Sequence, residues 1–72
     1  MMYERNGKRY EVGDRISVRE GTRVKWYEIA DFKLNGSILV KYWENDGPPR
    51  YERAVFRVVQ PDTLGLTPIK SV

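Results

Sequence analysis

The segment at 25–43, KWYEIADFKLNGSILVKYW, carries the clearest strand signals in the chain and a turn signal at its centre. It is rich in β-branched and aromatic residues, which favour β-strands. Asn35-Gly36 lies near the middle, and this dipeptide is typical of tight turns between paired strands. The segment also holds both tryptophans and two of the five tyrosines. It therefore predicts a β-hairpin whose rings either fill a small core or form a surface for a ligand.

Further strand signals flank this hairpin on both sides. In 14–20, DRISVRE, apolar residues alternate with polar ones, which predicts a half-buried strand. The segment 44–49, ENDGPP, cannot continue a sheet because proline lacks a backbone N–H donor. The segment 50–61, RYERAVFRVVQP, predicts a fourth strand and, after a break near Ala54, a fifth strand that ends at Pro61. We therefore expect an all-β protein.

Chain length and turn spacing indicate the architecture. Turn signals recur about every 8 to 12 residues, and no helical stripe or internal repeat interrupts them. In a chain of 72 residues, this pattern predicts one domain, a small five-stranded barrel of the SH3-like type at 1–61. The remaining residues, 62–72, are expected to be a C-terminal tail or an edge extension. So short a chain buries only about 60% of its unfolded surface, which predicts a free energy of unfolding of a few kcal/mol.

The composition argues against several kinds of site. The chain contains neither cysteine nor histidine, which excludes disulfides, thiolate–metal sites and the standard catalytic triads. Nearly all the candidate carboxylates lie beside lysine or arginine, where solvated ion pairs are the usual arrangement. A glycine-rich phosphate loop is missing as well. We therefore expect a non-catalytic domain without a metal ion or cofactor.

The N-terminal segment, the length of the apolar runs and the net charge indicate the expected location and partners of the protein. The stretch MMYERNGKRY is polar and charged, unlike a signal peptide, and no apolar run approaches the roughly 20 residues of a membrane span. With no cysteine, the chain fits an intracellular protein of the cytoplasm, nucleus or nucleoid, with no membrane partner. The net charge of +3 suggests an anionic partner, although a positive surplus also keeps a small domain soluble.

Strand alternation sorts the aromatic residues between two faces. With Ile29 in the core, Trp26 points outward, and with Tyr42 in the core, Trp43 does so too. The alternative is that an indole only caps an open end of the barrel. Exposed aromatic rings beside basic residues form a stacking surface for nucleotides. By contrast, the phenylalanines are expected in the core or as plugs at the barrel ends: Phe32 and Phe56.

These observations predict a module that binds DNA or RNA through a basic face with exposed tryptophans. Sequence specificity is expected to be low, because a barrel of this size presents no recognition helix. Contacts with three or four phosphates predict that log affinity falls with log salt at a slope of about −3. The residues expected to form this surface are Arg23, Lys25, Trp26, Lys41, Trp43, Arg50 and Arg53.

Three segments of the chain resemble Tudor-like and chromo-barrel modules. They are VGDRISVRE, WYEIADFKLNGSILVKY and RYERAVFRV, within 11–61. The resemblance lies in Gly-Asp before the first strand, Trp-Tyr opening the second, Val-x-Tyr on the third and a glutamate before the last Arg-apolar pair. It implies an SH3-like barrel and an alternative function as a protein-interaction module. Such a module would read methylated lysine or arginine through an aromatic cage, or would be an adaptor that docks a protein partner.

The resemblance also implies where that cage would lie. A quaternary ammonium gains about 0.5 to 2 kcal/mol from a well-placed ring face. Lys41, Arg50 and Arg53 near such a cage would repel a cation, which favours an anionic ligand instead. The aromatic residues implied for the cage are Trp26 or Tyr27, Tyr42, and Tyr51 or Trp43, and the acidic residue is Glu44 or Asp46.

Overall fold

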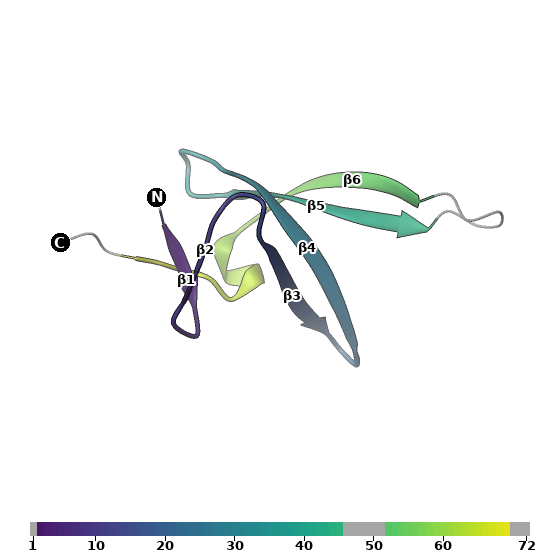
Figure 1. Cartoon of the computed structure of the whole chain (residues 1–72), viewed down its shortest axis with the longest axis horizontal. Coiled ribbons are helices and arrows are strands. Elements are labelled where there is room, and N and C mark those ends of the chain that lie inside the picture. Colours follow the sequence, from purple (N-terminus) through teal and green to yellow (C-terminus); the bar gives the residue numbers. More distant parts are fainter. Residues whose placement is uncertain (1, 46–51, 70–72) are drawn as a thin grey trace.

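The computed structural model describes residues 2–45 and 52–69, which form β-strands and one short 3₁₀ helix (Figure 1). The prediction of an all-β protein is confirmed. The strands of these described residues form two antiparallel sheets, with the orders β2-β1-β7 and β3-β4-β5-β6, and these sheets do not close into a barrel. The elements are β1 (Tyr3–Arg5), β2 (Lys8–Tyr10), β3 (Arg15–Glu20), β4 (Arg23–Phe32), β5 (Ile38–Asn45), β6 (Glu52–Val59), η1 (Pro61–Leu64) and β7 (Thr67–Pro68).

The hairpin predicted at 25–43 is formed by β4 and β5. Its turn is closed by the Gly36 amide, which donates to the Lys33 carbonyl at 3.0 Å. Gly36 has a φ of +89°, a left-handed conformation that glycine adopts without strain. The side chain of Asn35 accepts hydrogen bonds from the Ser37 amide at 3.0 Å and the Ser37 hydroxyl at 2.6 Å. Each residue of the Asn-Gly pair thus contributes separately to the turn.

A β-bulge interrupts the pairing of β4 with β5. Ile29 pairs with Val40, whereas Asp31 pairs with Leu39, so the register shifts between Ile29 and Asp31. Uninterrupted alternation would have placed the Asp31 carboxylate on the face that carries Ile29. The extra residue instead leaves Asp31 exposed and turns Phe32 toward the core.

The fourth strand is longer than expected. Every residue of β6 from Glu52 to Val59 pairs with β5 in one continuous register. The predicted break near Ala54, with a separate fifth strand after it, is therefore wrong. Ala54 pairs directly with Trp43, and nothing in this ladder bends the strand at that point.

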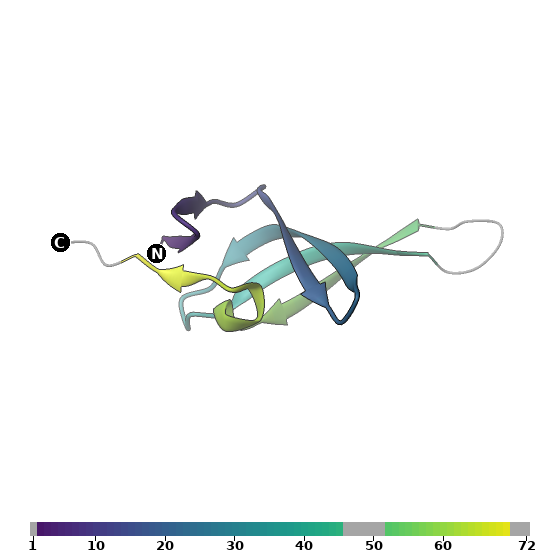
Figure 2. The ribbon, with the colours of Figure 1, turned by 90° about the horizontal axis from the view of Figure 1, so that it is seen from below.

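The smaller sheet joins the two ends of the described chain. Its β1–β2 hairpin turns at Asn6 and Gly7, which both have positive φ, as the tightest hairpin turns require. Part of the predicted tail then returns through η1, and β7 pairs with β1. Figure 2 shows this small sheet and η1 gathered at one end of the larger sheet, while β5 and β6 extend away from them.

The core lies on one face of the larger sheet, called the inner face below. The smaller sheet, η1 and the residues after it contribute side chains from the opposite side. The Arg5 guanidinium ties these parts together, because its Nη1 donates to the Ser17 carbonyl at 2.7 Å and to the Leu64 carbonyl at 3.3 Å. The buried cluster consists of Tyr3, Tyr10, Ile16, Tyr27, Ile29, Ile38, Val40, Tyr42, Val59, Leu64 and Leu66.

The two phenylalanines differ in position. Phe32 packs against the core and stacks on Tyr3, with ring centroids 5.2 Å apart. Phe56 is 58% exposed, so the prediction that it lies in the core or plugs a barrel end is wrong. It pairs with Lys41 and therefore lies on the face opposite the core, called the outer face below. In the described part of the chain, no helix has the length and apolar character that crossing a membrane requires.

Candidate ligand groove on the outer face

The outer face of the larger sheet carries a row of exposed apolar side chains. Trp26 is 61% exposed and Trp43 is 45% exposed, which confirms the prediction that both indoles point away from the core. An exposed apolar patch that extends over several strands commonly marks an interaction site. The patch extends over β4, β5 and β6 and consists of Val24, Trp26, Trp43, Phe56 and Val58.

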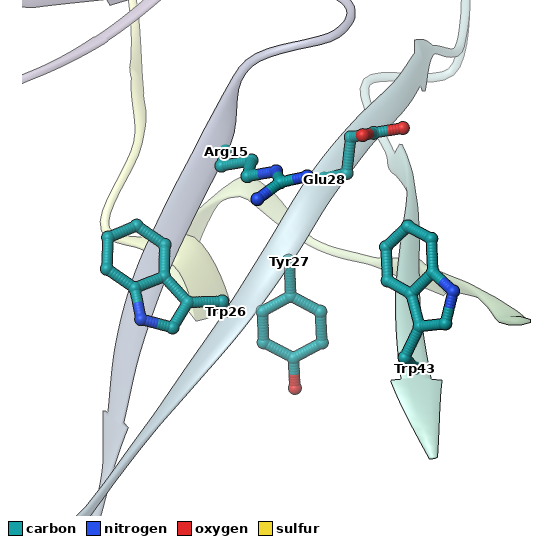
Figure 3. Close-up of a pocket in the computed structure, with 5 residues that line it drawn as sticks. All are labelled: Arg15, Trp26, Tyr27, Glu28 and Trp43. Carbon is teal, nitrogen blue, oxygen red and sulfur yellow. The ribbon is translucent and has the colours of Figure 1, made fainter. Parts of the chain in front are cut away.

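A groove of about 280 Å³ lies between the two tryptophans. Each of them stands two residues beyond the Glu28–Lys41 pair, toward the same end of the sheet, so the antiparallel register places both on one face. Figure 3 shows the two indoles on either side of the groove, with Arg15 and Glu28 at one end of it. The residues that line the groove are Arg15, Trp26, Tyr27, Glu28 and Trp43.

Charged side chains form a row across the sheet beside this groove. Arg15 pairs with Glu28 across β3 and β4, and Glu28 pairs with Lys41 across β4 and β5. The Lys41 ammonium lies 4.8 Å from the centroid of the Trp43 ring. Two cations thus flank one carboxylate, and an anionic group at this end of the groove meets a net positive charge.

Arg15 was not among the residues predicted to bind a ligand. The signal was nevertheless present in the sequence, because Arg15 precedes Ile16, which is completely buried. Alternation along the strand therefore turns Arg15 to the outer face. What the sequence did not show was that β3 and β4 pair in the register that places Arg15 beside Glu28.

The predicted basic residues are divided between the two faces. Lys41 lies on the outer face with both tryptophans, whereas Arg23, Lys25 and Arg53 belong to the inner-face side of their strands, beyond the core. Arg53 forms a 3.4 Å ion pair with Glu44 there. Arg50 lies outside the described residues. The structure therefore brings together three of the predicted residues, Trp26, Lys41 and Trp43.

The residues implied for an aromatic cage are divided in the same way. Trp26 and Trp43 lie on the outer face, while Tyr42 and Tyr27 are buried on the inner-face side, although Tyr27 also borders the groove. The Lys25 ammonium lies 4.0 Å from the Tyr42 ring centroid and 5.4 Å from that of Tyr27. The Lys25 ammonium thus already contacts both of these rings. Glu44 also lies toward the inner face, and the two remaining candidates, Asp46 and Tyr51, are outside the described residues.

The raised pKa of Tyr27 predicts how the free energy of unfolding depends on pH. Its hydroxyl donates to a Glu20 carboxylate oxygen at 3.2 Å. Burial raises the pKa of Tyr27 above its ordinary value near 10, and nearby Lys25 offsets part of this rise. Because the folded chain holds the proton more tightly than the unfolded chain, this contribution to stability is complete below pH 10 and is lost as the pH rises further.

We therefore expect the free energy of unfolding to fall above about pH 10 more steeply for the wild type than for Tyr27→Phe. Urea unfolding followed by circular dichroism between pH 7 and 11 measures both slopes. The two proteins share every other side chain, so only the difference between the slopes reports Tyr27. Equal slopes would contradict the assignment.

Neither the described side chains nor a comparison with known proteins indicates a more specific kind of site. The described residues contain no group of three or more histidine, cysteine, aspartate or glutamate side chains that could hold a metal ion. The groove is instead built from indole faces and charged side chains, which suit stacking and electrostatic binding. No protein-family model, no curated protein and no solved structure matches this chain, so the role of the groove rests on its own geometry.

Proposed function

We propose that this chain is a non-catalytic module that binds single-stranded nucleic acid on the outer face of its larger sheet. The supporting observation is the pair of exposed indoles, Trp26 and Trp43, that line one groove. Every nucleic acid base has a flat π face, and stacking on an aromatic side chain contributes about 1 to 3 kcal/mol per base. One base stacks against these rings, with little dependence on its identity.

The position of the rings supports a single-stranded ligand rather than a duplex. In a duplex the base faces are covered by neighbouring bases, whereas an unpaired base can turn its face to a side chain. The indoles stand on a sheet surface rather than on a helix that could enter a groove of the duplex. Arg15 and Lys41 lie beside them, where the phosphates that flank the stacked base can be contacted.

Charge favours this ligand over a methylated side chain. Among the described residues, Arg15 and Lys41 flank one carboxylate, Glu28, beside the indoles. A cationic ligand would be repelled there by more charge than attracts it. On the inner face, the Tyr27–Tyr42 pair already contacts the ammonium of Lys25. An aromatic cage for methyl-lysine is thus the less favoured function on both faces.

We also propose that the fold is an open variant of the SH3-like barrel of Tudor-like and chromo-barrel modules. In support, β3 to β6 form a meander of four consecutive strands, and β7 returns to pair with β1. The smaller sheet lies over the inner face, so the two sheets enclose one core without sharing a strand.

The function is tested by titrating the chain with a single-stranded DNA, a single-stranded RNA and a duplex of equal length, about ten nucleotides. Tryptophan fluorescence should be quenched by both single strands and much less by the duplex. Two phosphate contacts predict a slope of log affinity against log salt of about −1.4, smaller in size than the −3 expected from sequence. Equal binding of the duplex, or no binding of any strand at low salt, would overturn the proposal.

A further inference from the structure

The two edges of the larger sheet differ in how they are covered. The Ile29 amide donates to the Asp14 carbonyl at 2.9 Å, and from this pair the antiparallel ladder alternates along β3. The alternation turns the carbonyl of Ser17 away from β4, toward the free edge of β3. Arg5 caps this carbonyl with the 2.7 Å hydrogen bond from its guanidinium. The β3 edge is therefore blocked to another strand at its middle.

The β6 edge has no such cover in the part of the chain that the structure describes. There, β6 pairs with β5 on one side and with no strand on the other. Continuing the same alternation across the sheet leaves the amide and carbonyl groups of Ala54, Phe56 and Val58 on the free edge. The side chains of Phe56 and Val58 are 58% and 52% exposed. A long, regular edge with exposed apolar side chains is a template for another strand.

We infer that β6 pairs antiparallel with β6 of a second copy of this chain. A two-fold axis relates the two strands, so the same surface is used by both copies. Residues opposite one another in an antiparallel pair lie on the same face, so the axis must lie midway between one residue and the same residue of the partner, and that residue is the centre of the register. Near the middle of the strand, the candidate centres are Val55, Phe56 and Arg57.

Charge selects among these registers. A register centred on Arg57 places Arg57 opposite the partner's Arg57. A register centred on Val55 places Arg53 opposite the partner's Arg57. Like charges directly opposite are destabilising. A register centred on Phe56 places the two phenylalanines opposite each other on the outer face and pairs Ala54 with the partner's Val58. The open hydrogen-bonding groups of both strands then meet in register, and the arginines face valines.

The salt dependence of this pairing is opposite to that of nucleic acid binding. Each copy carries a net charge of +3, and four arginines from Arg53 and Arg57 lie near the joined edges. Salt screens this repulsion, so self-association should strengthen as salt rises. Binding of a nucleic acid should weaken under the same conditions. The dimer and the proposed function can therefore be tested independently in one salt series.

Sedimentation velocity of the full chain from about 1 µM to about 1 mM tests the inference. The wild type should shift from its 8.5 kDa monomer to twice that mass. Phe56→Lys places two ammonium groups opposite each other at the axis and should weaken association at least about tenfold. Val24→Lys is the matched control, since it adds the same charge at an outer-face residue that is 57% exposed but lies on β4.

A cross-link tests the register. The chain has no cysteine, so Phe56→Cys introduces a single thiol in each copy. Opposed residues in a hydrogen-bonded antiparallel pair have Cα atoms about 5.5 Å apart, a separation that a disulfide can bridge. Under mild oxidation this variant should cross-link far faster than Val24→Cys. A wild type that stays monomeric throughout, a Phe56→Lys variant that dimerises normally, or equal cross-linking of the two cysteine variants would overturn the inference.

Discussion

Replacement of Ile29 by alanine is expected to leave most of the chain unfolded or close to its unfolding midpoint. Ile29 is completely buried at the centre of β4. Removing such a side chain typically costs about 2 to 5 kcal/mol, because apolar burial is lost and a cavity remains. A core in a chain this short rarely supplies more than about 3 to 5 kcal/mol. Urea unfolding followed by far-ultraviolet circular dichroism measures the loss.

The substitution Ile29→Ala measures the contribution of the side chain to stability separately from that of the backbone hydrogen bonds. The amide and carbonyl of Ile29 bond to the backbone of Asp14 and Gly13 at 2.9 and 2.8 Å, and alanine keeps both hydrogen bonds. Val24→Ala on the same strand is the control, because Val24 is 57% exposed and its truncation should change stability by less than about 0.5 kcal/mol. Equal unfolding midpoints for the two variants would show that the core does not depend on Ile29.

The β4–β5 hairpin could be predicted because its signals are local. Alternation around Ile29 and Tyr42 was enough to place Trp26 and Trp43 in solvent. The register of one strand depends on its own pattern when one face is buried. The β-bulge in the same strand keeps Asp31 out of the core, where uninterrupted alternation would have placed its carboxylate.

Long-range pairing explains what the sequence did not reveal. From the sequence, a break was predicted near Ala54, and Phe56 was predicted to lie in the core or to plug a barrel end. In the structure, continuous pairing with β5 carries Phe56 to the same face as Lys41. Whether the sheet closes into a barrel likewise depends on strands far apart in sequence, such as β1 and β7, whose contact no local pattern specifies.

The candidate site was only partly predictable for a similar reason. Lys25 precedes Trp26 in sequence, but neighbours on a strand point to opposite faces. The ammonium of Lys25 consequently lies over Tyr27 and Tyr42, on the other side of the sheet from the indole. Arg15 is distant from Trp26 in sequence but lines the same groove, because β3 pairs with β4. Residues that are adjacent in sequence therefore do not lie on the same face, whereas residues on paired strands line the same groove.

Replacing Trp26 by alanine is expected to weaken the binding of single-stranded oligonucleotides by about 5- to 150-fold, the loss of one stacked base. The residue is 61% exposed, so the truncation leaves the core intact and should not unfold the chain. Trp43→Ala should have an effect of similar size and should also release Lys41, whose ammonium lies over the Trp43 ring. Fluorescence anisotropy of a labelled oligonucleotide measures the affinity of both variants.

Trp26→Phe separates stacking from other effects of the substitution. The phenyl ring keeps a face for the base, so this variant should recover a substantial part of the affinity lost in Trp26→Ala, and the circular dichroism spectra of both variants show whether folding is altered. Leu34→Ala, at a fully exposed residue between β4 and β5 and outside the apolar patch, should bind like the wild type. If Trp26→Ala retained full affinity while its circular dichroism spectrum matched the wild type, bases would not stack on Trp26, and the proposed role of the groove between the two indoles would be contradicted.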